Sequence, residues 1–179
     1  MLPLPLPLPL IVCCVLVTGL VASVPVAADV VTEVRLLLDR NDAHGALRAA
    51  DSALSLQPRD PQTRFMKGVA LMALERDGEA LAAFTAFSQE FPELPEPYNN
   101  IALLHARAGR LEQARQALET ALRNDPGHRA ARANLGEVHL MLAVQAWEQA
   151  AASGPLDPRV MRKLDAARAL LEGSGAQAR

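Results

Sequence analysis

Apolar and polar residues follow one another along residues 29–172 in a pattern that predicts a series of short helices. Gly and Pro punctuate this pattern, and they mark the expected helix ends. Asp60–Pro61 and Asp157–Pro158 each have the form of an N-cap followed by proline at the first helical position. We expect helices near residues 29–40, 43–56, 61–75, 78–90, 96–108, 111–124, 128–142, 144–153 and 158–172.

An internal repeat organises these helices, because Pro58, Pro92 and Pro126 lie 34 residues apart. Alignment on these prolines places alanines in one column, which contains Ala46, Ala80 and Ala114. A second column contains the small residues Gly68, Ala102 and Gly136. A third contains Leu or His, at Leu37, Leu71, His105 and His139. The columns indicate stacked hairpins of antiparallel helices, in which only Gly or Ala leaves room for a neighbouring backbone at a close crossing. Gly109 is expected to end a helix in a left-handed turn.

The repeat resembles that of the tetratricopeptide repeat (TPR) family over about 125 residues. Residues 95–128 and 61–94 match best, residues 29–60 form a weaker unit, and a fourth unit that begins at Leu135 departs from the pattern because it has no Gly turn. The matching residues are Tyr98, Ala102, Gly109, Ala114, Leu118, Ala121 and Pro126 in one unit, and Gly68, Ala80, Phe84 and Pro92 in the other. The resemblance implies an all-α solenoid of about four helical hairpins, the first and last degenerate.

The last predicted helix, 158–172, is expected to cover the open end of the stack, because terminal repeats need a cap with a polar outer face. Its apolar residues should face inward, and these are Val160, Leu164, Ala167 and Leu171. Its basic residues should face outward, and these are Arg159, Arg162, Lys163 and Arg168. The solenoid with this cap should span 29–172, followed by a disordered tail at 173–179.

Composition narrows the class of protein. The 179 residues are enough for one domain with a core, and the aromatic content of 3% argues against a β-sandwich or barrel. A formal net charge of -2 offers no broad basic surface, so we expect no nucleic-acid partner.

Residues 1–28 form a separate segment, because no charged side chain precedes Asp29. Prolines at 3, 5, 7 and 9 give way to an apolar run from Leu10 to about Val26, and the small residues that follow suit a signal-peptidase site before Asp29. Lys and Arg are absent from its start, which departs from the usual signal peptide. The apolar run is near the lower limit for spanning a bilayer, so a retained membrane anchor is the alternative to cleavage. We therefore expect an exported, periplasmic protein or one anchored in the inner membrane. Cys13 and Cys14 are interpreted as apolar filler.

The TPR resemblance assigns a concave groove to the first helix of each unit. It places Gln62 and Glu96 in this groove together with the principal candidates for peptide binding: Phe65, Met66, Val69, Met72, Asn99, Asn100, Leu103, Arg107, Asn134, Glu137 and Met141. Asn100 and Asn134 lie one repeat apart and resemble an asparagine ladder that holds a peptide backbone, although bonding within the protein is an equal alternative. Met66 and Met72 could likewise form an adaptable apolar patch or plain core.

The other candidate chemistry is weak. His105 and His139 share a column, but equivalent positions in successive units are too far apart to bind one metal ion, so we expect both to pack structurally. His44 and His128 fall in turns and should be solvated, and Trp147 should pack under the last helix. We expect no enzyme, cofactor or metal, but a module that binds an extended peptide or helix of a partner protein; the alternative is an assembly subunit that self-associates or fills its groove with its own last helix.

Overall fold

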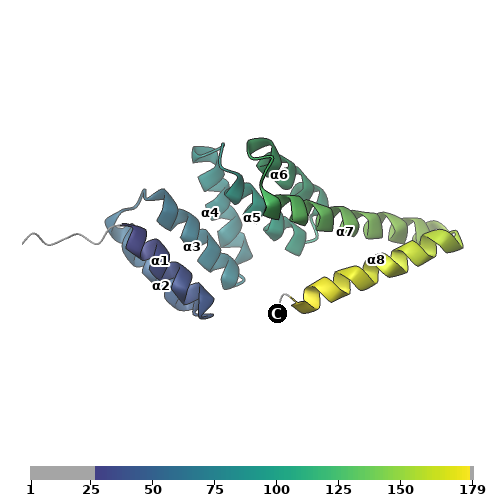
Figure 1. The fold of residues 1–179 in the computed structure, drawn as a ribbon, viewed down its shortest axis with the longest axis horizontal. Helices are drawn as coiled ribbons and strands as arrows, with labels where there is room; N and C mark the ends of the chain where they lie inside the picture. Colours follow the sequence, from purple (N-terminus) through teal and green to yellow (C-terminus); the bar gives the residue numbers. More distant parts are fainter. Residues whose placement is uncertain (1–26, 178–179) are drawn as a thin grey trace, which may run out of the picture.

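The computed structural model describes residues 27–177, so the predictions for 1–26 and 178–179 lie outside the described residues. This part of the chain contains α-helices and no strand, as the sequence predicts (Figure 1). The helices are α1 (Ala27–Asp39), α2 (Ala43–Leu56), α3 (Pro61–Ala73), α4 (Asp77–Glu90), α5 (Pro95–Arg107), α6 (Leu111–Asn124), α7 (Arg129–Ser153) and α8 (Pro158–Gln177). None of the helices within 27–177 has the length and apolarity needed to cross a bilayer.

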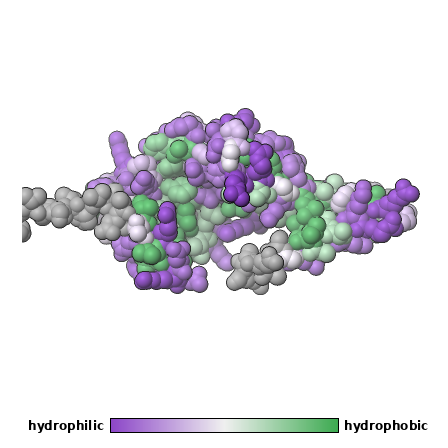
Figure 2. Space-filling model, viewed as in Figure 1, coloured by the Kyte–Doolittle hydropathy of each residue, from purple (hydrophilic) through white to green (hydrophobic). Residues whose placement is uncertain are grey.

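The helices form antiparallel pairs that stack side by side, each helix packing against the next along the chain (Figure 1). Asp60 caps α3 by accepting a hydrogen bond from the backbone N–H of Thr63 at 2.8 Å, and Pro61 occupies the first turn as predicted. Hydrophilic residues cover much of the visible surface, and apolar residues also reach it over the α1–α4 part (Figure 2).

The turn inside each of the first three hairpins has the same backbone geometry. Asn41, Glu75 and Gly109 lie 34 residues apart and adopt φ of 59°, 56° and 70°. In each turn, this residue and the next one donate backbone hydrogen bonds to the preceding helix in a Schellman motif. The bonds are Asn41 N to Leu38 O, Asp42 N to Leu37 O, Glu75 N to Met72 O, Arg76 N to Leu71 O, Gly109 N to Ala106 O and Arg110 N to His105 O. The predicted left-handed turn at Gly109 is therefore confirmed, and it recurs in two units that use other residues.

The proline corners between hairpins also repeat. Helices α2, α4 and α6 each end two residues before Pro58, Pro92 or Pro126. The side chain of Asn124 donates to the carbonyl oxygen of Pro92 at 2.7 Å and so links one corner to the next unit. The corners at Pro92 and Pro126 consequently lie along one edge of the stack.

The fourth unit differs from the prediction. Residues 128–142 and 144–153 were expected to form two helices, but α7 is a single helix of 25 residues. The position equivalent to Gly109 is Ala143, which lies inside α7 and has no positive φ. The helix thus continues where the other units turn; the β-carbon of Ala143 is not sufficient to explain this, because Asn41 and Glu75 also carry one and still adopt the left-handed turn.

Helix α8 folds back along the distal part of α7, and the two form a hairpin that projects from the stack (Figure 1). Leu164 and Ala167 are buried, Val160 and Leu171 are half-buried, and the four basic residues are exposed, as predicted. The guanidinium of Arg168 lies 2.6 Å from the carboxylate of Glu148 on α7. Helix α8 continues to Gln177, whereas the sequence predicts an end at 172 and a disordered tail.

Small residues lie at the closest helix contacts, although not always for the expected reason. Ala46, Ala80 and Ala114 are fully buried. A Cβ on Gly68 would lie 2.7 Å from the ring of Phe84, so this glycine makes room for an aromatic side chain rather than for a neighbouring backbone. A Cβ on Gly136 would meet nothing within 4 Å, because the continuous α7 leaves no second helix folded back over that position.

Candidate functional site

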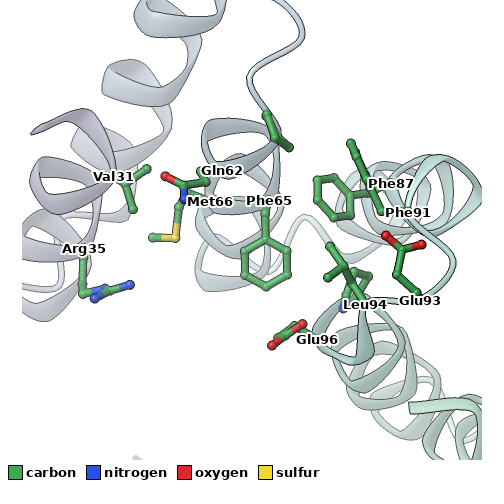
Figure 3. A pocket seen from close by; sticks show the side chains of 12 residues that line it. Val31, Arg35, Gln62, Phe65, Met66, Phe87, Phe91, Glu93, Leu94 and Glu96 are labelled. Carbon is green, nitrogen blue, oxygen red and sulfur yellow. The ribbon is translucent and has the colours of Figure 1, made fainter. Parts of the chain in front are cut away.

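A hollow among the described residues lies between α3 and α5, with α1 and α4 at its sides. Helix α1 packs against α3 and α5 packs against α7, whereas α3 and α5 lack a contact of comparable extent. The hollow has a volume of about 590 Å³ and is called the α3–α5 pocket below (Figure 3). It is lined by Val31, Arg35, Pro61, Gln62, Phe65, Met66, Phe87, Phe91, Glu93, Leu94, Glu96 and Pro97.

Aromatic rings form the wall of the pocket on the α3 and α4 side. Phe65 packs edge-on against Phe84 and Phe87, with ring centroids 5.5 Å and 5.9 Å apart, and Phe87 lies 4.8 Å from Phe91. The guanidinium of Arg64 lies 5.7 Å from the centroid of Phe87, and its Nη1 donates to Glu90 Oε2 at 2.5 Å. These contacts hold the rings in place, so the pocket is a preformed apolar surface.

Three charged side chains lie at the rim of the pocket (Figure 3). Arg35 belongs to α1 on one side, and Glu93 and Glu96 belong to the α4–α5 loop and the start of α5 on the other. All three are exposed, and none forms an ion pair with another described residue. The rim therefore has one basic side and one acidic side.

The structure gathers only some of the predicted groove residues at this pocket. Phe65 and Met66 line it, together with Gln62 and Glu96. Met66 and Met72 are buried in the core, as the alternative interpretation holds, while the other apolar candidates are half-buried: Val69, Leu103 and Met141. Phe87 and Phe91 also line the pocket, but the sequence analysis did not identify them as site residues. Two phenylalanines one helical turn apart, near the end of the second helix of a unit, could have indicated an apolar surface there.

The asparagine ladder takes a different form from the one predicted. The amide of Asn134 donates to Asn99 Oδ1 at 2.9 Å, so Asn134 contacts the residue before Asn100, its equivalent in the repeat. Asn134 therefore bonds within the protein, which was the alternative to peptide contact. Asn100 is half-buried and makes no side-chain hydrogen bond with another described residue.

The groove cation Arg107 is engaged with the preceding unit. Its Nη1 lies 3.2 Å from Asp77 Oδ1 and 3.4 Å from the carbonyl oxygen of Met72 at the end of α3. Glu137 is exposed on α7 and does not line the pocket. Arg107 and Glu137 therefore stay predicted groove positions, but neither lines the α3–α5 pocket.

The histidines have separate environments. Partial burial and the nearby charge of Arg110, which donates to Nδ1 at 3.0 Å, lower the pKa of His105. His139 is exposed, so its predicted packing is wrong, because no second helix covers that part of α7. His128 was expected to be solvated, but it caps α7 by accepting from the N–H of Ala131 at 3.1 Å. Within residues 27–177 no three His, Cys, Asp or Glu side chains come together as a metal site.

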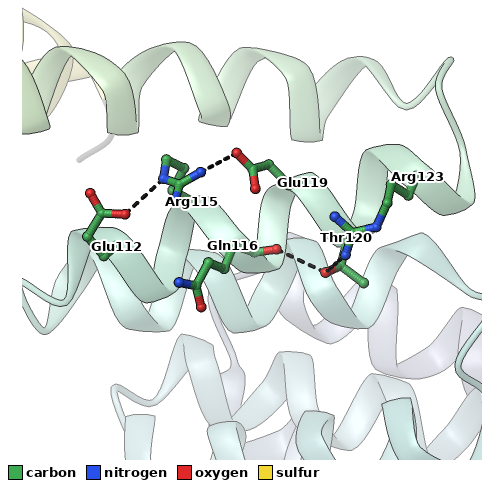
Figure 4. Close-up of polar contacts among 6 residues, drawn as sticks. All are labelled: Glu112, Arg115, Gln116, Glu119, Thr120 and Arg123. Atoms are coloured by element: carbon green, nitrogen blue, oxygen red, sulfur yellow. Dashed lines mark hydrogen bonds and ion pairs between the residues drawn. The ribbon is translucent and has the colours of Figure 1, made fainter.

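The charged side chains of α6 pair with one another along the helix (Figure 4). Arg115 bridges Glu112 at 2.8 Å and Glu119 one turn further on, and these carboxylates raise the pKa of its guanidinium. Arg123 donates to the hydroxyl of Thr120 at 2.7 Å.

Trp147 is half-buried in the part of α7 beside α8, and its packing under α8 stays a prediction.

Comparison with known proteins identifies the repeat. The sequence profile of the tetratricopeptide repeat family matches residues 31–95 and 99–158. No curated protein matches the chain.

Among solved structures, the Sgt2 TPR domain from Aspergillus fumigatus is 17% identical over 75% of this chain and 88% of its own, with a TM-score of 0.62. The first TPR of Spaghetti (RPAP3), bound to an HSP90 peptide, is 15% identical over 65% and 92%, with a TM-score of 0.59. PcrH, in complex with the chaperone binding region of PopD, is 15% identical over 68% and 92%, with a TM-score of 0.55. These likenesses show the fold, and the profile match shows that the chain belongs to the tetratricopeptide repeat family.

Proposed function

We propose that this protein is a non-catalytic interaction module that binds a segment of a partner protein across the first helices of its units, with one large apolar side chain of the partner inserted in the α3–α5 pocket. The observation that carries this proposal is a preformed aromatic wall beside an open volume of about 590 Å³. Burial of one large apolar side chain there contributes roughly 1.5–3 kcal/mol. No α8 residue whose side chain the structure describes lines the pocket, and filling of the groove by the last helix stays the alternative to a partner segment.

Main-chain contacts would supply the rest of the affinity. The unpartnered amide of Asn100 lies on α5, the helix that forms one side of the pocket, and an amide can both accept from and donate to a peptide backbone. Two of the similar structures, the Spaghetti TPR and PcrH, are complexes with a peptide or a region of another protein. Because these proteins of the same fold bind polypeptide segments, they support the proposal that the partner of this chain is also a protein.

The proposal is tested by filling the pocket from its exposed edge. Gln62 is exposed and lines the pocket, so Gln62→Trp should occupy it without disturbing the core. The matched control is Gln116→Trp, an equally exposed glutamine on α6 that lies outside the pocket. Capped peptides selected from a random library on the wild-type protein would be measured by fluorescence anisotropy. We expect Gln62→Trp to weaken binding at least about tenfold, because it displaces the inserted side chain, which contributes at least about 1.4 kcal/mol.

Thermal unfolding of both variants guards against a general loss of structure. Equal affinities of the two variants, with both folded, would exclude the α3–α5 pocket as the binding site. Selection of peptides without a large apolar residue would exclude the insertion of an anchor.

We also propose that residues 1–28 direct export to a bacterial cell envelope, by cleavage or as a retained anchor. The charge-free apolar segment that ends in small residues supports this proposal. Mass spectrometry of the N-terminus of the protein from fractionated cells tests it: a chain that starts near Asp29 indicates cleavage, an intact chain in the membrane indicates an anchor, and an intact chain in the cytoplasm contradicts export.

A further inference from the structure

The rim charges of the α3–α5 pocket restrict the chemistry of the partner. From their arrangement we propose that the pocket takes an extended segment in which a large apolar anchor has basic residues on one side only, those residues lying over Glu93 and Glu96. This inference rests on the proposed function and adds to it the charge pattern of the partner.

The acidic side of the rim is available to a ligand. Glu93 in the α4–α5 loop and Glu96 in the first turn of α5 are both exposed, beside Leu94 and Pro97. Neither carboxylate is neutralised by a basic side chain of the described residues, whereas nearby Glu90 is already paired with Arg64. A basic side chain of the partner that lies beside the anchor would therefore be attracted by two carboxylates that no other basic group neutralises.

The opposite side of the rim excludes a second cation. Arg35 projects from α1 at the other edge of the pocket and is likewise exposed and unpaired (Figure 3). A segment with basic residues on both sides of its anchor would place one of them against this guanidinium. The pocket thus favours a one-sided charge pattern, because unlike charges attract at one edge and like charges repel at the other.

The dimensions suit an extended peptide. Packed helices such as α1 and α3 lie about 8–10 Å apart, and α5 does not pack closely on α3, so a path from α1 across α3 to α5 covers at least roughly 20 Å. An extended chain crosses this distance in about six residues at ~3.3 Å each. Charges two to three residues from a central anchor therefore reach the rim.

The test uses the full chain and capped peptides, which carry no terminal charge. Three peptides share a central Phe: the first has lysines at the second and third positions on one side, the second has glutamates there, and the third has lysines on both sides. A fourth peptide is the first with Phe→Ala. We expect the wild-type protein to bind the one-sided lysine peptide roughly five- to tenfold more tightly than the glutamate peptide at low salt, with the preference shrinking at high salt. Glu93→Lys with Glu96→Lys should reverse the preference.

A matched control separates the pocket from the overall charge of the protein. Asp165→Lys with Glu172→Lys makes the same change in net charge at two exposed positions of α8, away from the pocket and from the predicted groove positions, and it should keep the wild-type preference. Arg35→Glu should improve binding of the two-sided lysine peptide more than of the one-sided peptide.

The outcomes distinguish this inference from the proposed function. Equal affinity for the lysine and glutamate peptides, together with a large loss on Phe→Ala, would overturn the charge pattern and leave the apolar pocket standing. An equal change in preference in the control variant would also overturn the charge pattern. No loss on Phe→Ala, or no binding of any of these peptides, would overturn the proposed function as well.

Discussion

At the residue scale, the same small residue has different consequences in different units. Gly68 and Gly136 occupy equivalent positions of the repeat, but only Gly68 faces a buried aromatic ring. Phe84 is fully buried and also forms part of the aromatic cluster with Phe65 beside the pocket. A glycine in the sequence therefore indicates a close contact only where a second helix is present to make it.

This difference yields a paired prediction for stability. Gly68→Ala should lower the free energy of unfolding by about 1–3 kcal/mol, because its Cβ would lie 2.7 Å from the ring of Phe84. Gly136→Ala should raise it by about 0.5–1 kcal/mol, because alanine favours the helix and meets open space. Urea denaturation followed by circular dichroism measures both variants, and a Gly68→Ala protein as stable as Gly136→Ala would contradict the packing of Phe84.

At the element scale, one backbone conformation decides whether a helix turns or continues. Asn41, Glu75 and Gly109 are left-handed, and each is followed by the second helix of its hairpin. Ala143 has the same place in the repeat but lies within α7, so the fourth unit becomes a long hairpin with α8. The predicted break near residue 143 was wrong for this reason.

Opposite substitutions at these two positions should both destabilise the protein. Gly109→Ala places a β-carbon at φ of 70° and should lower stability by about 1–2 kcal/mol. Ala143→Gly should lower the stability of α7 by about 1 kcal/mol, because glycine in a helix interior is unfavourable. Thermal unfolding monitored at the helical circular-dichroism band checks both. A stabilised Ala143→Gly protein would indicate that this unit prefers the shorter, turned hairpin.

At the scale of the whole molecule, stability is transmitted between neighbouring helices. The described residues form two buried clusters, one over α1–α5 and one over α5–α7, while α8 packs chiefly against α7. Helix α8 therefore depends on α7, but the first three hairpins do not depend on α8.

Two large-to-small substitutions test this independence. Leu164 on α8 and Leu118 on α6 are both buried, and each change to Ala should remove roughly 2–5 kcal/mol of packing energy. Hydrogen exchange followed by mass spectrometry should show Leu164→Ala accelerating exchange mainly in α8 and distal α7. Leu118→Ala should accelerate it in α5, α6 and proximal α7. Equal acceleration along the whole chain after Leu164→Ala would instead indicate a single cooperative unit.

The sequence by itself determined the helical class, the period of 34 residues and the ends of the first six helices to within a few residues. These features depend on local restraints: the fixed φ of proline at the corners, the side-chain oxygen of Asp60 as a cap, and a residue that accepts positive φ in each turn. Such restraints act within a few residues, so a linear pattern records them.

Only the tertiary structure decided the candidate site. The α3–α5 pocket exists because α3 and α5 do not pack closely together, while the packing of α4 against α3 brings Phe87 beside Phe65, and Phe91 follows directly after α4. The packing of α7 against α5 likewise paired Asn134 with Asn99, and the packing of neighbouring units placed Arg107 against Asp77. These contacts depend on the angle and offset between helices, which result from the packing of many side chains together and from no single stretch of the sequence.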